Sequence, residues 1–207
     1  MPTDANKIVL AVMIVWYFLV RMHYQDFARH RLPHHTVQPR REQLLNLSTS
    51  LWIVPVLVFI FTPLIDPLRL PFSDVLQKTG AVITPAGILL FWWTHSTLGR
   101  NWSPYLQVNI RRNFVDRGPY RWIRHPMYLS VFITGVGITL LSANWLVGLV
   151  FLLPTALLAL IRIPAEEALL RAAFGQAYLD YQARTGRFLP RIWRLHPLNQ
   201  HQNHQNQ

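Results

Sequence analysis

The stretch Gly118-Pro119-Tyr120-Arg121-Trp122-Ile123-Arg124-His125-Pro126-Met127-Tyr128 decides the fold of this chain, because it leads directly into a long apolar run. No Asp, Glu, Lys, Arg or His occurs between residues 126 and 161. As a single helix this run would be about 54 Å long, nearly twice the roughly 30 Å hydrocarbon core of a bilayer. The run must therefore fold back on itself. Its polar break, Ser142-Ala143-Asn144, predicts a tight helical hairpin whose two ends return to the same side of the membrane.

Further apolar runs predict an all-α, polytopic membrane helical bundle with about five transmembrane helices. Hydrophobic residues make up 51% of the 207 residues, and there is no cysteine, which excludes disulfides and thiolate metal sites. We expect one integral-membrane domain over 1–195, with its catalytic core at 98–190, followed by a disordered polar tail at 196–207. The expected spans are residues 8–20 with a few flanking residues, 44–65, 79–99, 126–141 and 145–161.

The basic residues alternate between the two sides of this five-span arrangement. Segments 21–42, 100–124 and 162–194 hold 17 of the 20 Lys and Arg residues, and all three fall on one side. The positive-inside rule makes that side cytoplasmic, with the N-terminus outside, as in a multi-pass protein of a bacterial inner membrane. The formal charge of +11 then indicates topology and contact with the lipid bilayer, and we expect no nucleic-acid partner.

Two groups of polar residues at the predicted cytoplasmic boundary are candidates for chemistry. Arg162 and Glu166 are four residues apart, so they share a helix face unless Pro164 distorts the turn. An exposed ion pair is the structural alternative, but ionisable groups at a membrane boundary favour function. His125 precedes Pro126 at a helix start, where free backbone donors attract anions. Its structural alternative is that the basic and aromatic side chains of 120–128 only hold lipid headgroups.

Histidine patterns are weaker candidates. His30-Arg31-Leu32-Pro33-His34-His35 has the spacing of one membrane di-iron desaturase box, but the other histidines outside the tail stand singly and Pro33 interrupts the helix. A basic loop explains this segment. The histidines of the tail fit a solvated segment, so we expect no metal site.

Several short motifs occur in a specific order between residues 98 and 190. They are Leu98-Gly99-Arg100-Asn101-Trp102-Ser103, Gly118-Pro119-Tyr120, Arg124-His125-Pro126-Met127-Tyr128, Glu166-Glu167, Phe174-Gly175-Gln176-Ala177-Tyr178-Leu179-Asp180-Tyr181 and Phe188-Leu189-Pro190. In this order they resemble the isoprenylcysteine carboxyl methyltransferase family and its bacterial, phospholipid methyltransferase-like relatives.

The resemblance implies S-adenosylmethionine as cofactor, held in a cytosolic pocket formed by the linker and the C-terminal helix. It also implies that Arg162 contacts the substrate and is the catalytic residue. Arg112 and Asn113 depart from the more apolar residues of the family. The implied cofactor contacts are Arg112, Asn113, Phe114, Val115, Tyr120, His125, Pro126, Met127, Tyr128 and Glu166.

The expected reaction is methyl transfer to a membrane lipid or prenylated small molecule. A carboxylate acceptor needs alignment and desolvation more than a base, and no dedicated base stands out in the sequence. Three alternatives stay open: N-methylation of a phospholipid amine, an NADPH-dependent sterol-type membrane reductase, and a non-catalytic protein that only contacts lipid.

Overall fold

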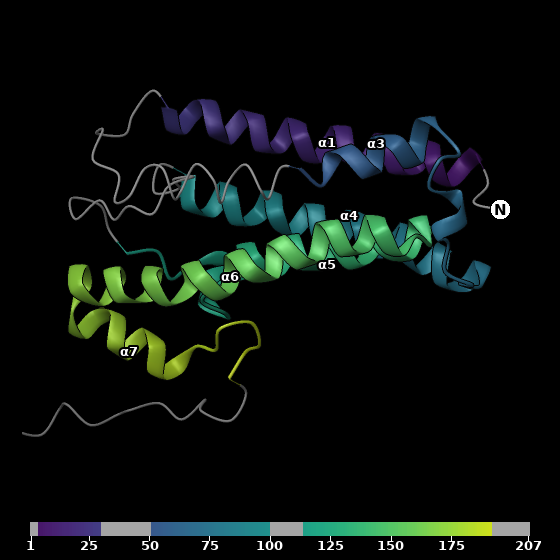
Figure 1. The fold of residues 1–207 in the computed structure, drawn as a ribbon. Helices are drawn as coiled ribbons and strands as arrows, with labels where there is room; N and C mark the ends of the chain where they lie inside the picture. Colours follow the sequence, from purple (N-terminus) through teal and green to yellow (C-terminus); the bar gives the residue numbers. More distant parts are fainter. Residues whose placement is uncertain (1–3, 30–50, 100–113, 192–207) are drawn as a thin grey trace, which may run out of the picture.

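The computed structural model describes residues 4–29, 51–99 and 114–191, which form a bundle of helices (Figure 1). No strand of a sheet occurs among these residues; two isolated bridges join loop segments. The all-α prediction is therefore confirmed. The helices are α1 (Asp4–Arg29), α3 (Ile53–Phe61), α4 (Asp74–Leu98), α5 (Pro126–Ser142), α6 (Trp145–Phe174) and α7 (Gln176–Arg184), with short 3-10 turns η1 (Asp66–Leu68) and η3 (Gly118–Arg121).

The predicted hairpin is the junction of α5 and α6. Ala143 turns the chain in the left-handed conformation, with φ 45°. Asn144 then caps α6, because its side-chain oxygen accepts hydrogen bonds from the backbone N–H groups of Leu146, at 3.0 Å, and Val147, at 3.3 Å. Its side-chain amide donates to the carbonyl of Ile65 at 2.8 Å, which ties the hairpin to the loop before α4. The polar break thus works as a turn and a cap together.

The apolar faces of α6 show which surface meets lipid. Val147 and Phe151 are buried, whereas Leu149, Leu153 and Leu157 are each about half exposed. A helix that is apolar on its exposed face as well as its buried one is expected in a membrane bundle. α1 likewise has apolar side chains on its exposed face as well as on its buried face.

The number of spans is only partly settled. Within the described part, three stretches are long and apolar enough to cross a membrane: Ala5–Tyr24, Asp74–Leu98 and Trp145–Phe174. The first agrees with the predicted span 8–20 and its few flanking residues. α5 is also apolar but has 17 residues, about 26 Å, so it falls slightly short of the hydrocarbon core. α3 has nine residues, and part of the predicted span 44–65 lies outside the described residues, so five spans stays a prediction.

Small residues allow α4 and α5 to pack backbone against backbone. A Cβ atom added at Gly87 would lie 2.4 Å from the side-chain oxygen of Thr134, and one at Gly137 would lie 2.5 Å from that of Thr84. Small residues at such contacts are common between membrane helices. Gly87 and Gly137 thus let α4 and α5 approach closely.

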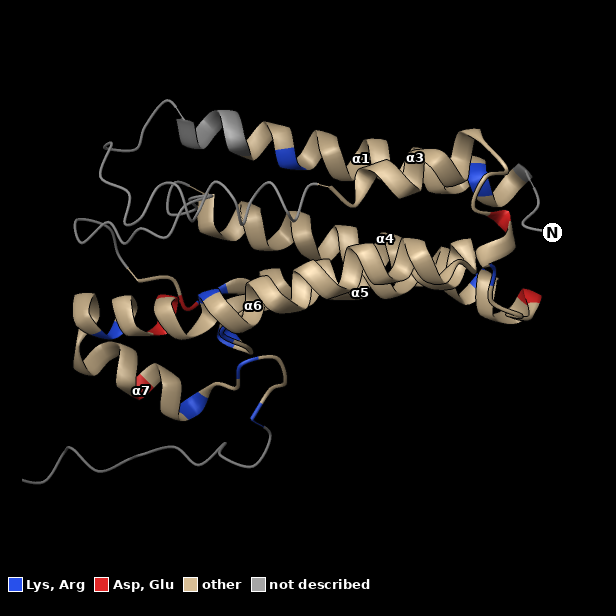
Figure 2. Ribbon diagram, viewed as in Figure 1, with Lys and Arg blue, Asp and Glu red and all other residues tan. Residues whose placement is uncertain are grey.

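Charged residues are sparse along the bundle: α5 carries none, α4 carries Asp and Lys only near its start, and α6 carries them only from Arg162 onward (Figure 2). Among the described residues an apolar core holds α1, α3, α4, α5 and α6 together, with Trp52 of the segment before α3 in contact with Tyr17 and Phe151. The start of α1 and helix α7 lie at opposite ends (Figure 1). The polar part of α6, the start of α5 and α7 meet at one end, where the predicted site residues lie.

Candidate functional site

Three segments build the polar end of the bundle. α6 continues through Pro164 to Phe174, so its last three turns project beyond its apolar part. α7 turns back beside the end of α6, and the segment that follows it returns to the start of α5 (Figure 1). There the backbone N–H of Arg124 donates to Gly186 at 2.8 Å, and that of His125 donates to Arg187 at 3.0 Å. The segment 185–191, named here the terminal strap, is thereby fixed against the start of α5.

Glu166 lies at the centre of a first group of polar side chains, the Glu166 cluster, with His125, Tyr128 and Arg162. The Tyr128 hydroxyl donates to Glu166 Oε1 at 2.6 Å, and Arg162 Nε lies 3.5 Å from the same oxygen. His125 Nδ1 is 3.8 Å from Glu166 Oε2. Arg162 is 8% exposed, but the Glu166 side chain is 26% exposed. The predicted sharing of one helix face by Arg162 and Glu166 is confirmed, and the cluster keeps a carboxylate accessible to a ligand.

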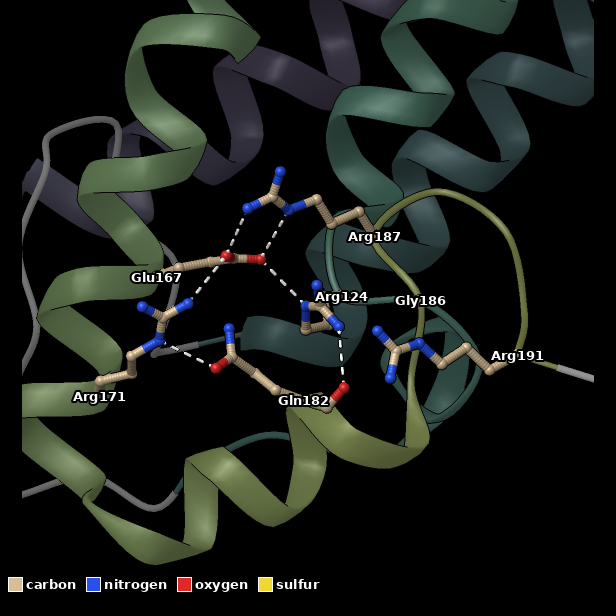
Figure 3. A pocket seen from close by; sticks show the side chains of 7 residues that line it. All are labelled: Arg124, Glu167, Arg171, Gln182, Gly186, Arg187 and Arg191. Atoms are coloured by element: carbon tan, nitrogen blue, oxygen red, sulfur yellow. Dashed lines mark hydrogen bonds and ion pairs between the residues drawn. The ribbon is translucent and has the colours of Figure 1, made fainter. Parts of the chain in front are cut away.

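Glu167 lies at the centre of a second group, the Glu167 cluster, which contains three arginines (Figure 3). Arg124 Nε donates to Glu167 Oε1 at 3.0 Å, and Arg187 Nη2 donates to Oε2 at the same distance. Arg171 Nη2 lies 3.5 Å from Oε2. The Glu167 side chain is only 2% exposed. Its hydrogen bonds raise the pKa of Arg187, so this guanidinium stays charged. Glu167 thus joins α6 to the start of α5 and to the terminal strap.

His125 connects the two clusters. Its Nε2 lies 3.3 Å from Glu167 Oε1, while its other ring nitrogen faces Glu166. The ring is 5% exposed and packs edge-on toward Tyr128, with 5.9 Å between ring centroids. The sequence suggested that His125 receives an anion. Two carboxylates face its ring nitrogens instead, so its position suits orienting Glu166 better than binding an anion.

An open pocket of about 470 Å³ lies on the Glu167 side of this end. Its walls come from α6, α7 and the terminal strap, and Figure 3 shows the Arg191 side chain reaching from the strap toward Arg124 and Gln182. The lining residues are Arg124, Glu167, Arg171, Gln182, Gly186, Arg187 and Arg191.

Aromatic side chains pack behind the two clusters. The Tyr181 hydroxyl donates to the backbone carbonyl of Tyr120 at 2.7 Å, and Phe114 packs against Tyr181 with 4.7 Å between ring centroids. Burial, together with the charge of Glu166, raises the pKa of Tyr120 well above its ordinary value, so it remains a neutral phenol. Burial raises the pKa of Tyr181 as well. These rings attach α7 to η3.

The structure brings part of the predicted site together. His125, Tyr128, Arg162 and Glu166 form one cluster, and Tyr120 lies close enough to Glu166 to be affected by its charge. Of the remaining predicted contacts, Pro126 begins α5, Met127 packs against the apolar core, Phe114 joins the aromatic layer and Val115 is half-buried. Arg112, Asn113, the segment 30–35 and the tail 196–207 lie outside the described residues.

Sequence reasoning missed the Glu167 cluster. Glu167 appeared only as the second letter of an acidic pair, and Arg187 is 20 residues away from it. No spacing rule predicts such a contact. The usable signal was the excess of arginine in the segments on both sides of the apolar hairpin, which a buried carboxylate can neutralise.

The fold and the site define a polytopic helical membrane protein with a polar site at one end of its bundle. Residues 81–172 match the Isoprenylcysteine carboxyl methyltransferase (ICMT) family. This stretch contains all four residues of the Glu166 cluster. Over these residues the chain is similar to the isoprenylcysteine carboxyl methyltransferase family.

Individual relatives extend this match. The mouse protein-S-isoprenylcysteine O-methyltransferase is 31% identical over 147 residues, which are 70% of this chain and 50% of the mouse protein. The nickel-cobalt-cadmium resistance protein NccN of Alcaligenes xylosoxydans xylosoxydans is 32% identical over 100 residues, 48% of this chain and 46% of that one. The solved structure of the eukaryotic intramembrane Ras methyltransferase ICMT aligns with a TM-score of 0.52 and 25% identity, covering 75% of this chain and 54% of that one. The chain thus spans about half the length of these relatives.

Proposed function

We propose that this protein transfers a methyl group from S-adenosylmethionine to a carboxylate on a lipid-like or prenylated acceptor. The observation that carries the proposal is the Glu166 cluster, in which an accessible carboxylate lies beside a buried guanidinium at the end of the apolar hairpin. Similarity to the isoprenylcysteine carboxyl methyltransferase family supports it, because the matched residues 81–172 include this whole cluster. The name of the mouse relative, an O-methyltransferase acting on S-isoprenylcysteine, supports a carboxylate acceptor.

The chemistry of the cluster fits the proposed cofactor. S-adenosylmethionine carries an ammonium group, a carboxylate, a sulfonium and an aromatic base, and it supplies an activated methyl group when bound. The partly exposed Glu166 carboxylate can bind an ammonium group, and such ionic hydrogen bonds are about twice as strong as neutral ones. Tyr128 and Tyr120 offer aromatic faces close to Glu166, which suit a cation or an adenine ring.

In this proposal the chain's own residues position the acceptor and exclude water. Arg162 is the nearest guanidinium to Glu166 and is largely buried, so it can hold a carboxylate in one orientation. A carboxylate is already a nucleophile and needs no base, and orientation supplies much of the acceleration in such a step. Glu166 and Tyr128 keep the Arg162 side chain in place.

The proposed acceptor enters sideways from the membrane. Arg162 directly follows the apolar part of α6, so an apolar tail can stay in lipid while its polar head reaches the guanidinium. Burial of each methylene group contributes about 0.8 kcal/mol, so a long tail supplies affinity without specific contacts. A long-chain acceptor should therefore react far faster than a short soluble analogue.

The proposed orientation puts the polar end with α7 in the cytoplasm and the N-terminus outside. The distribution of basic residues supports it, and the start of α1 and α7 lie at opposite ends of the bundle (Figure 1). Reporter fusions in the segment 66–73, which precedes α4, test this. A cytoplasmic signal there would overturn the orientation.

Calorimetry of S-adenosylmethionine binding to the purified full chain tests the cofactor. Glu166→Gln should bind about ten- to hundred-fold more weakly, because a charge-assisted hydrogen bond is worth about 1.5 to 3 kcal/mol. His125→Ala should also bind more weakly, because the ring no longer orients Glu166. Asp180→Asn on exposed α7 is the matched control and should bind normally. NADPH binding in place of S-adenosylmethionine would favour a reductase instead.

Transfer of labelled methyl groups tests the acceptor. Prenylated carboxylates should be methylated, and phospholipid amines of equal chain length should not. Equal rates for soluble and lipid-like carboxylates would contradict membrane entry of the acceptor. Preferred methylation of the amine would replace the proposed acceptor with its main alternative.

A further inference from the structure

The pocket beside Glu167 carries a large excess of positive charge. Arg124, Arg171, Arg187 and Arg191 line it, and Glu167 is the only acidic lining residue. Four guanidinium groups therefore face one carboxylate, which leaves a net positive charge. Because Glu167 itself is 2% exposed, the surface offered to a ligand is cationic. A pocket of this kind suits an anion, and guanidinium groups match the geometry of a phosphate.

The arginines keep hydrogen-bond donors for such a ligand. A guanidinium has five N–H donors. Arg191 makes one hydrogen bond to the described residues, from Nη1 to the carbonyl of Ala183 at 2.9 Å. Arg187 engages Glu167 through Nε and Nη2, and Arg171 engages Gln182 and Glu167 through the same two atoms. Both side chains are about half exposed, which leaves their remaining donors accessible from solvent.

The depth of the pocket matches the headgroup layer of a bilayer. Glu167 lies six residues past Ile161, the last apolar residue of the α6 span, which is about 9 Å along the helix. The headgroup region on each side of the hydrocarbon core is roughly 5 to 8 Å thick. At about 9 Å, Glu167 lies at the outer edge of this layer, so the pocket opens next to the lipid headgroups and not deep in the cytosol.

Exposed apolar side chains lie beside the pocket. The terminal strap, which carries Arg187 and Arg191, also carries Leu189, which is 76% exposed, and Phe188, which is 37% exposed. Trp122, only two residues from Arg124, is 56% exposed. A soluble phosphate would make no apolar contact with these side chains. The acyl chains of a phospholipid can contact them while its phosphate binds the guanidinium groups.

We propose that this pocket is a binding site for the phosphate-bearing headgroup of an anionic phospholipid, separate from the Glu166 cluster and independent of the proposed methyl transfer. Arg191 and Arg171 bind the phosphate from two sides, with Arg187 between the ligand and Glu167. Bound lipid then neutralises the excess charge and holds the terminal strap against α6. Because the strap is hydrogen-bonded to Arg124 and His125, lipid in this pocket stabilises the end of the bundle.

Binding of short-chain phosphatidylglycerol to the full chain in uncharged detergent tests the proposal, with phosphatidylcholine of the same chain length as comparison. Phosphatidylglycerol should bind saturably and raise the unfolding temperature. Arg191→Gln should weaken that binding about tenfold or more, and Arg191→Lys should weaken it less, because a lysine keeps the charge but lacks the planar fork. Arg184→Gln is the matched control, since Arg184 pairs with Asp116 on the surface and does not line the pocket.

Four results would each overturn the proposal. Arg191→Gln could bind phosphatidylglycerol as tightly as Arg184→Gln does. Phosphatidylcholine could bind equally well. Inorganic phosphate could compete at the same concentration as the lipid, which would make this a site for soluble phosphate. S-adenosylmethionine could displace the lipid competitively, which would make the pocket part of the cofactor site. If the chain binds phosphatidylglycerol but not S-adenosylmethionine, only the proposed methyl transfer fails.

Discussion

Glu166 and Glu167 are adjacent in the sequence but serve different parts of the molecule. The Glu166 side chain is 26% exposed and contacts Tyr128 and Arg162. The Glu167 side chain is 2% exposed and is held by Arg124 and Arg187. One residue along an α-helix turns the side chain by about 100°, so the two carboxylates point at different neighbours. One side of α6 thus keeps an accessible polar group, and the other is closed by ion pairs.

This difference in exposure predicts that the Glu166 cluster serves binding and the Glu167 cluster serves stability. A carboxylate that is partly accessible can exchange its protein partners for a ligand at little cost. A buried carboxylate held by several arginines cannot, because any partner left alone would be a buried, unpaired charge. Changes on the Glu167 side should therefore lower stability first, and changes on the Glu166 side should lower binding or turnover first.

The largest effect is expected from Glu167→Ala. Removal of this carboxylate leaves Arg124, whose side chain is 7% exposed, without its ionic partner. Loss of one member of a buried pair costs about 3 to 5 kcal/mol. Thermal unfolding in detergent should show this loss, and Glu166→Ala should lose much less. Equal destabilisation by the two variants would remove the distinction between the clusters.

Arg162→Ala should act on turnover. We expect the variant to fold and to bind S-adenosylmethionine, while kcat falls on the order of 100-fold, about 2.7 kcal/mol, because the acceptor is no longer positioned. Methyl transfer from labelled cofactor, measured beside cofactor affinity, separates the two effects. Normal turnover in this variant would exclude Arg162 from the reaction.

Tyr128→Phe should have a smaller effect. It deletes the 2.6 Å hydrogen bond to Glu166 but keeps the aromatic ring. The cofactor affinity should fall about two- to tenfold, since a typical hydrogen bond contributes about 0.5 to 1.5 kcal/mol net. Calorimetry on wild type and variant measures it, and Tyr181→Phe on the other side of the aromatic layer is the control. An unchanged affinity would mean that Tyr128 does not orient Glu166 for binding.

Arg184→Gln should change almost nothing. Arg184 and Asp116 form an ion pair at 2.9 Å, but both side chains are about half exposed. Surface pairs of this kind contribute little, so stability should change by less than about 0.5 kcal/mol. Lipid and cofactor binding should stay normal. A large loss of stability would show that the link between α7 and the segment before η3 matters more than the buried cluster does.

Much of the bundle follows from local sequence. The hairpin was predictable because a 36-residue charge-free run exceeds the membrane thickness and offers one polar break, which became the left-handed Ala143 and the cap Asn144. The pairing of Arg162 with Glu166 was predictable because helical periodicity fixes residues four apart. The first span was predicted as 8–20 with a few flanking residues, and the apolar stretch Ala5–Tyr24 of α1 agrees with it.

What the sequence alone determined is therefore the set of properties that depend on neighbours within a few turns: apolar runs, the hairpin, the start of α5 at Pro126 and one ion pair. Only the tertiary structure decided which carboxylate is buried. The backbone hydrogen bonds of Gly186 and Arg187 to the start of α5 bring the terminal strap back across α6. This return places Arg187 on Glu167, 20 residues away, and leaves Glu166 accessible. No local pattern encodes that choice, because it depends on where a distant segment of the chain packs.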